Sequence, residues 1–252
     1  MFVVFRGLLY PFIGTLTGSA FVFFSKRKPT ERFMTVLDSL AGGIMCAASF
    51  FSLIRPAIEQ AENHTVLSRL FCSVGFFSGL VAFILINKIT EKILSEKSKS
   101  GNMMFFAVTV HNIPEGMAVG VVFAGLLTGR EDVSIASAMT LSLGIAMQNI
   151  PEGAIITIPQ NMRGKSRQTA FLYGVFSGVA ELFAGALTLS AAAFVYGILP
   201  FSLCFAAGAM FYVVLSELSG GFTDKKNSVV SLISFDTGFV IMMLLDTMLG
   251  QA

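Results

Sequence analysis

The sequence has few charged residues. Lys, Arg, Asp and Glu make up 13% of its 252 residues, whereas 54% are hydrophobic and 26 are phenylalanine. A water-facing surface needs about a quarter of its residues charged, so this composition excludes a soluble globular domain. The formal net charge of +2 is too small to indicate a nucleic-acid-binding surface. We therefore expect a protein whose surroundings are the lipid bilayer, with no nucleic-acid partner.

Cysteine and several enzyme motifs are also scarce or absent. The three cysteines all fall in apolar segments, and such an odd set gives no disulfide framework. The chain has no HExxH motif of a metalloprotease and no Glu-x-x-His pair of a di-iron enzyme. It also lacks the GxxxxGK[ST] loop of a nucleotide-driven pump. We therefore expect a protein that is not an enzyme, has no catalytic cofactor and drives any transport without ATP.

Eight apolar segments are long enough to cross a bilayer, which takes about 20 residues. The first is expected to be a retained helix rather than a signal peptide, because Arg6 stands alone and the apolar run continues to Phe24. The sequence thus predicts an all-α polytopic membrane protein with one transmembrane domain over residues 1–252. Its predicted helices are Phe2–Phe24, Phe33–Pro56, Leu67–Ile89, Met103–Leu127, Ile135–Ile158, Ala170–Leu189, Ala193–Leu218 and Val229–Leu249.

Basic residues concentrate in alternate connections between these segments. The connections after the first, third, fifth and seventh segments hold most of the Lys and Arg, whereas the opposite connections hold only Arg69 and Arg130, with Arg55 nearby. Because cytosolic loops of membrane proteins are enriched in Lys and Arg, this bias predicts both termini outside the cytosol. It also predicts a polar cytosolic loop at about residues 88–102, between the third and fourth helices.

Two near-identical phrases, His111–Gly116 (HNIPEG) and Gln148–Gly153 (QNIPEG), interrupt the fourth and fifth apolar segments. Residues three and four apart share a helix face, so each glutamate lies one turn from the polar pair before it. Pro114 and Pro151 cannot donate an amide hydrogen bond, so each is expected to kink its helix and free a backbone carbonyl. Lipid tolerates such a carbonyl only against protein or a water-filled cavity.

Glu115, Glu152 and Glu181 are predicted at mid-membrane depth, where an ionised carboxylate costs about 2.5–3.5 kcal/mol. No Lys or Arg lies at that depth in the sequence, so these groups must be protonated, hydrated or neutralised by a cation. A divalent metal ion neutralises two carboxylates at once, and three carboxylates can bridge two ions. One such phrase alone could be a structural kink with a protonated acid, but its repetition favours a metal site. Neutral N and O ligands beside the carboxylates come from His111, Asn112, Gln148 and Asn149.

At these phrases the sequence resembles the ZIP (Zrt-/Irt-like protein) family of divalent metal transporters, as a bacterial-type member. The fourth and fifth helices of the family carry HNxPEG and (H/Q)NxPEG phrases, and the ELFAG of its sixth helix matches Glu181–Gly185. The resemblance covers most of the chain. It implies eight helices with outside termini in the plasma membrane, and elevator-type alternating access that moves metal into the cytosol. Zinc is the implied cargo, although Fe, Mn and Cd also suit N and O ligands, and the resemblance points to a homodimer.

The resemblance also implies roles for individual residues. A binuclear metal centre would be formed by His111, Asn112, Glu115, Gln148, Asn149, Glu152 and Glu181. The transport pathway would include Ser52 at the outer gate, Glu217 at the cytosolic exit and Asp246 at the entrance. Gln148 and Asn149 stand where relatives have stronger ligands, so a second metal is expected to bind weakly or to be structural.

Two other classes of function stay open at this point. A proton-coupled carrier of a non-metal solute would also use protonatable glutamates inside the membrane. An intramembrane metalloenzyme fits less well, because the chain has the order His-x-x-x-Glu in a single copy and no adjacent glutamate base. Uptake of a panel of divalent ions distinguishes metal transport from both.

Overall fold

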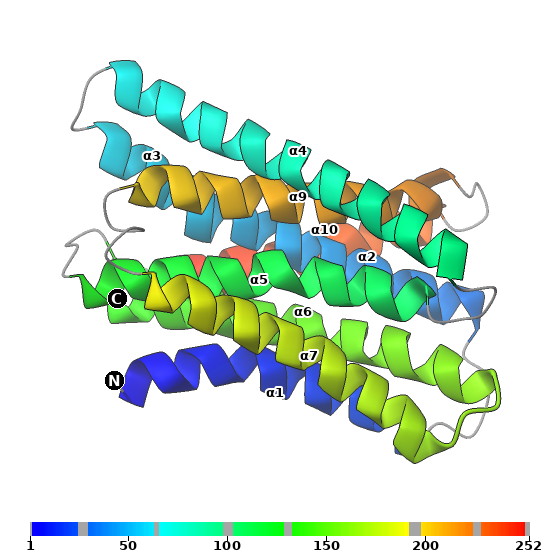
Figure 1. Ribbon diagram of the computed structural model, residues 1–252. Helices are drawn as coiled ribbons and strands as arrows, with labels where there is room; N and C mark the ends of the chain where they lie inside the picture. Colours follow the sequence, from blue (N-terminus) through cyan, green and yellow to red (C-terminus); the bar gives the residue numbers. More distant parts are fainter. Residues whose placement is uncertain are drawn as a thin grey trace.

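The protein is described by a computed structural model that covers residues 2–24, 30–62, 66–97, 103–128, 133–191, 198–223 and 228–249. Over these residues all regular structure is helical, and the helices run roughly along one direction in a single bundle (Figure 1). The two ends of the chain lie at the same end of this bundle. The helices are α1 (Phe2–Phe24), α2 (Glu31–Ala48), the π-helix η1 (Ser49–Ile54), α3 (Arg55–Glu62), α4 (Val66–Lys97), α5 (Met103–Leu127), α6 (Ile135–Met162), α7 (Arg167–Ser190), α9 (Leu199–Thr223) and α10 (Ser228–Leu249).

Within the described residues, six helical stretches are long and apolar enough to cross a membrane. They belong to α1, α2–η1–α3, α4, α7, α9 and α10. The remaining two helices, α5 and α6, carry the repeated phrases. Asn112–Leu127 of α5 forms a shorter apolar helix, and α6 contains the polar residues Gln148, Asn149 and Glu152 within its apolar sequence. The chain is therefore an all-α, multi-pass membrane protein, and its eight spans and outside termini stay predictions.

Most of the predicted loop at residues 88–102 is helical where it is described, because α4 continues to Lys97; its cytosolic location stays a prediction. Glu, Lys and Leu in this stretch are good helix formers, so a polar composition did not imply a loop. Residues 98–102 lie outside the described part of the chain. The second predicted segment is also longer than expected and is helical from Glu31 to Glu62, with a π-helical turn inside it.

The helices form two groups with extensive packing inside each. The first group comprises α1, α5, α6 and α7, in which α1 packs along α6 and α5 along α7. The second group pairs α2 with α10 and α4 with α9. The groups meet mainly where α6 lies against α2 and α5 against α9. We call the first the site group and the second the outer group, to which η1 and α3 also belong because they pack mainly against α2, α4 and α9.

Glycine residues bring helix backbones together inside the site group. A Cβ atom at Gly14 or Gly18 of α1 would overlap the backbone of Ala146 or Ile150 of α6. On α5, a Cβ atom at Gly120 would meet the backbone of Gly185 on α7. Small residues at this spacing are typical of closely packed membrane helices. The glycine spacing in the sequence thus reflects close helix packing.

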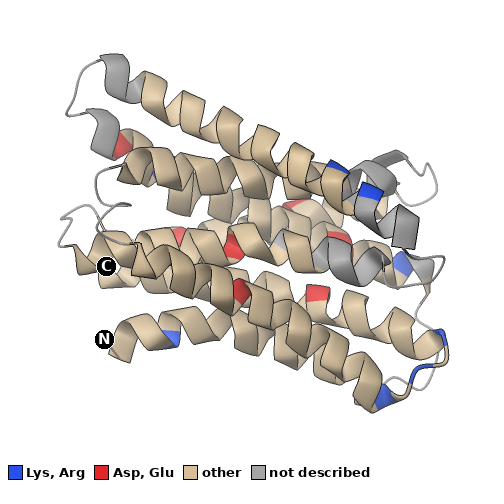
Figure 2. Cartoon of the chain, in the orientation of Figure 1, with Lys and Arg blue, Asp and Glu red and all other residues tan. Residues whose placement is uncertain are grey.

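Charged side chains are unevenly distributed along the bundle. Most described Lys and Arg residues gather at the end opposite the chain termini (Figure 2), whereas α5, α6 and α7 each carry one glutamate in the interior of the sequence of the helix. The three glutamates concerned, Glu115, Glu152 and Glu181, are buried. The fold therefore places acidic groups inside the bundle, at a distance from its basic end.

Candidate metal centre

The repeated phrases place polar side chains on the facing sides of three helices. Both α5 and α6 are continuous α-helices through Pro114 and Pro151, and α7 contributes Glu181. Six of the seven predicted ligands are 0–6% exposed. The seventh, His111, lies on α5, but its side chain is outside the described part of the structure. The six are Asn112, Glu115, Gln148, Asn149, Glu152 and Glu181.

Carboxamide groups donate to two of the three carboxylates. The Nε2 atom of Gln148 donates to Oε1 of Glu115 across 2.6 Å and links α6 to α5. The Nδ2 atom of Asn149 donates to Oε2 of Glu181 across 2.8 Å and links α6 to α7. Glu152 interacts electrostatically with Glu181. The site therefore connects carboxylates on three helices through the amides of α6.

Two further residues belong to this polar cluster, and the sequence did not single them out. Nδ2 of Asn112 donates to the carbonyl oxygen and to Oγ of Ser177, at 3.2 and 3.3 Å. Asn149 also donates to the carbonyl oxygen of Pro11 on α1, at 3.1 Å. Ser177 could have been found from its position one turn before Glu181 on α7. The Pro11 carbonyl could not, because it depends on how α1 packs against α6.

Several buried oxygen atoms of the cluster face no hydrogen-bond donor among the described residues. They are Oδ1 of Asn112, Oε1 of Gln148, Oδ1 of Asn149 and Oε1 of Glu181. A buried polar atom without a partner costs about 1–3 kcal/mol, and native structures contain few of them. Four such oxygen atoms in one cluster therefore indicate a binding partner that accepts lone pairs. A metal ion is such a partner.

The glycine that ends each phrase has a packing role beside the glutamate. A Cβ atom at Gly116 would overlap the carbonyl oxygen of Glu181 on α7. A Cβ atom at Gly153 would overlap the carbonyl oxygen of Thr15 and press on the amide of Ser19, both on α1. Each Pro-Glu-Gly unit thus combines a carboxylate with close approach of a neighbouring helix. This explains why the two phrases share their last residues.

Among the described residues, no three His, Cys, Asp or Glu side chains lie close enough together to hold a metal ion. The possible ligand atoms around the glutamates are instead largely carboxamide oxygens. The His111 side chain lies outside the described part of the structure. Oxygen donors of this kind suit Zn²⁺ less strongly than thiolate or imidazole and also suit harder divalent ions. The binuclear arrangement therefore stays a prediction.

The structure brings together two of the three predicted pathway residues. Oγ of Ser52 donates to Oδ1 of Asp246 across 3.0 Å, and both side chains are buried. Ser52 lies on the π-helix η1, where the amide of Arg55 bonds the carbonyl of Phe50 five residues earlier. The third residue, Glu217, lies on α9, but its side chain is outside the described part. Single π-helical turns often mark functional sites, and the sequence did not predict this one.

Comparison with known proteins shows which proteins this chain is similar to. No family model matches the chain. It is 40% identical to zinc transporter ZIP11 of Xenopus tropicalis, over 94% of each chain. It is also 40% identical to zinc transporter ZIP11 of Homo sapiens, over 59% of this chain and 43% of that relative. Zinc transporter ZIPB of Bordetella bronchiseptica is 29% identical over 89% of this chain and 74% of its own.

The fold and the site define the class of this protein: it is a multi-pass helical membrane protein with a buried centre of carboxylates and carboxamides. The similarity along nearly the whole Xenopus relative narrows this class to one family. The chain belongs to the ZIP family, as the repeated phrases predicted. Its relatives are named zinc transporters, so the chain is a membrane transport protein of this family rather than an enzyme.

Proposed function

We propose that this protein is a secondary transporter that moves divalent metal ions, zinc foremost, into the cytosol across the plasma membrane. The observation that carries the proposal is the set of buried oxygen atoms without donors, next to three buried glutamates. A divalent cation both neutralises the carboxylates and occupies the lone pairs of the amide oxygens. A proton on one carboxyl group supplies a single O–H donor, which leaves most of these buried oxygen atoms without a partner.

The proposed site is binuclear. Glu115 with Gln148 on one side, and Glu181 with Asn149 on the other, give two neighbouring carboxylate–carboxamide pairs. Glu152 interacts electrostatically with Glu181 and would share in the second ion. Asn112 supplies a further amide oxygen from α5, and His111 is proposed as the imidazole ligand of the first ion. Zinc is the bound and transported ion, and no catalytic cofactor is involved.

The two helix groups support an elevator-type mechanism. The residues of the proposed site lie on α5, α6 and α7, all in the site group, whose internal packing is more extensive than its contacts with the outer group. Ser52 and Asp246, which lie on η1 and α10 of the outer group, form the proposed entrance. The metal would enter past this pair, bind in the site group and leave near Glu217 when that group moves. A homodimer formed through the outer group would give the fixed frame.

Zinc uptake into proteoliposomes tests this function, with Glu115→Gln as the variant. This change keeps the size of the side chain but removes the charge that neutralises the metal, so we expect uptake to fall by about tenfold or more. Asp236→Asn removes an exposed carboxylate from α10 and should leave uptake unchanged. A panel of Zn²⁺, Fe²⁺, Mn²⁺ and Cd²⁺ would rank the cargo ions. Wild-type uptake by Glu115→Gln, or proton flux without metal flux, would overturn the proposal and favour a proton-coupled carrier.

A further inference from the structure

Two cysteines of the outer group lie near each other on neighbouring helices. Cys72 on α4 and Cys204 on α9 are 6% and 2% exposed, and both line one pocket. Sγ of Cys72 also donates to the carbonyl oxygen of Ala57 on α3, across 3.6 Å. The pair thus lies where α3, α4 and α9 meet.

The backbones of α4 and α9 are close at this point. A Cβ atom at Gly75, one turn after Cys72, would lie 3.3 Å from Cβ of Cys204 and 2.7 Å from the carbonyl oxygen of Phe201. A Cβ atom at Gly79 would overlap the carbonyl oxygen of Phe205. A disulfide between two helices needs Cα atoms about 4.4–6.8 Å apart. Glycine packing brings α4 and α9 close together beside this pair, which favours such a link.

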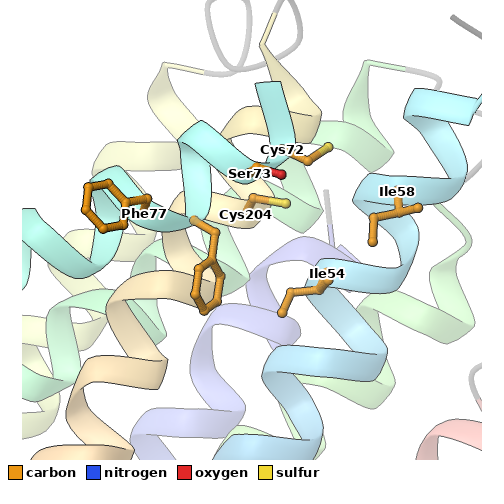
Figure 3. Close-up of a pocket in the computed structure, with 7 residues that line it drawn as sticks. Ile54, Ile58, Cys72, Ser73, Phe77 and Cys204 are labelled. Carbon is orange, nitrogen blue, oxygen red and sulfur yellow. The ribbon is translucent and has the colours of Figure 1, made fainter. Parts of the chain in front are cut away.

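An apolar pocket of about 620 Å³ gives access to the thiols. Figure 3 shows Cys72, Ser73 and Cys204 on one side of this pocket, with Ile54 and Ile58 opposite. Ile58 and Phe77, which line the pocket, are 43% and 66% exposed, so the pocket opens on the outer surface of the helices. A small uncharged oxidant can therefore reach the pair. The apolar walls disfavour a charged metal–thiolate complex but accept a neutral disulfide.

We propose that Cys72 and Cys204 form a reversible disulfide with a peroxide as oxidant. The sulfur of Cys72 attacks one oxygen of hydrogen peroxide as the O–O bond breaks, and the Cys72 proton leaves with the other oxygen as water, which gives a sulfenic acid. The sulfur of Cys204 then attacks the sulfur of Cys72, and the sulfenic oxygen leaves as a second water with the Cys204 proton. The two thiols together lose two electrons and two protons, and the peroxide is reduced to two waters. Under the orientation proposed above, the pair lies toward the outside, where disulfides persist.

The disulfide would change how α3 is held. Reduced Cys72 donates its thiol proton to the carbonyl of Ala57, and a disulfide sulfur has no proton to donate. Oxidation therefore replaces a bond between α3 and α4 with a covalent link between α4 and α9. The released α3 directly follows the π-helix that holds Ser52, so the redox state of the pair would act on the proposed entrance.

The test treats the purified full-length protein with hydrogen peroxide and counts reactive thiols with maleimide after denaturation. The reduced chain has three cysteines, and the oxidised wild type should bind two fewer maleimides until a phosphine reductant is added. Cys72→Ser and Cys204→Ser should each abolish this loss, whereas Cys46→Ser, the matched control on α2, should retain it. Peptide mapping of the oxidised wild type should find Cys72 linked to Cys204, without any variant that could misfold.

Three outcomes would overturn the inference: an unchanged maleimide count, a linked peptide that contains Cys46, or the same loss in Cys72→Ser. Amide hydrogen exchange in Arg55–Glu62 should rise several-fold on oxidation in the wild type but not in Cys204→Ser. Unchanged exchange would contradict the release of α3. None of these measurements involves transport, so their failure is distinct from failure of the proposed function.

Discussion

At the scale of single residues, the centre is organised by carboxamides that use their two ends differently. The nitrogens of Gln148 and Asn149 each donate to a glutamate oxygen, while their own oxygens have no described donor. An aspartate in either place would bind metal more strongly but has no N–H group to donate to the neighbouring carboxylate. The amides therefore keep the glutamates ordered before metal binds and still offer oxygen ligands when it arrives.

Gln148→Glu tests whether a cation belongs between these groups. The change replaces the 2.6 Å hydrogen bond with two facing carboxylates, so without metal the free energy of unfolding should fall by about 1–3 kcal/mol. This corresponds to roughly 2–4 °C in Tm per kcal/mol for a chain of this size. Zinc should raise the Tm of the variant more than that of the wild type, because the added carboxylate attracts the ion. Thermal unfolding in detergent with EDTA or with zinc measures both effects.

Gln160→Glu is the matched control, because Gln160 is also buried on α6 but belongs to no phrase. It should destabilise the protein in EDTA without gaining stability from zinc. Equal recovery of both variants in zinc would contradict a metal site at Gln148.

At the scale of helices, glycine decides which pairs can meet. Gly18→Ala should separate α1 from α6, since its Cβ atom would overlap the carbonyl oxygen of Ile150. Helix propensity alone favours alanine by about 1 kcal/mol, whereas overpacking costs about 1–3 kcal/mol, so the net change should be destabilising. Thermal unfolding of the purified protein measures it. Gly125→Ala is the control, because its added methyl group meets only side-chain ends of Leu199 and Val133. It should be neutral or stabilising. An equal loss of stability in both variants would refute the role of the α1–α6 contact.

Six of the seven predicted ligands are buried in one polar cluster, and the information for this clustering is local in the sequence, whereas their role as metal ligands stays a prediction. The spacing within each phrase puts its glutamate and its amides one turn apart. Because the surrounding segment is apolar, these polar groups must face protein rather than lipid. The π-helical turn at Ser52 was not predicted, since its only local signal is Pro56, which lacks an amide donor. Its partner Asp246 lies 194 residues away, and Cys72 and Cys204, which line one pocket, are also far apart in the sequence. Contacts between remote segments depend on helix packing, and hydrophobic periodicity does not specify which helices pair.

At the scale of the whole molecule, the polar centre and the proposed entrance lie in different helix groups. An apolar pocket of about 320 Å³ lies between these groups. Leu37 and Ile44 of α2 line one side of it, and Ile150 and Ala154 of α6 line the other. If α6 moves against α2 during transport, the shape of this pocket must change in each cycle. An added side chain that fills the pocket should therefore oppose the motion without touching the metal ligands.

Leu37→Trp places an indole in this pocket from the outer group. We expect zinc uptake into proteoliposomes to fall by about tenfold or more, because the barrier to movement rises by at least about 1.4 kcal/mol. Zinc should still raise the Tm of the variant as it does for the wild type, since the ligands on α5, α6 and α7 are unchanged. Leu232→Trp on α10, where the side chain is 49% exposed, is the matched control and should transport normally. Normal uptake by Leu37→Trp would show that the two groups do not slide past each other at this pocket, whereas loss of both uptake and zinc stabilisation would place the defect in the metal centre.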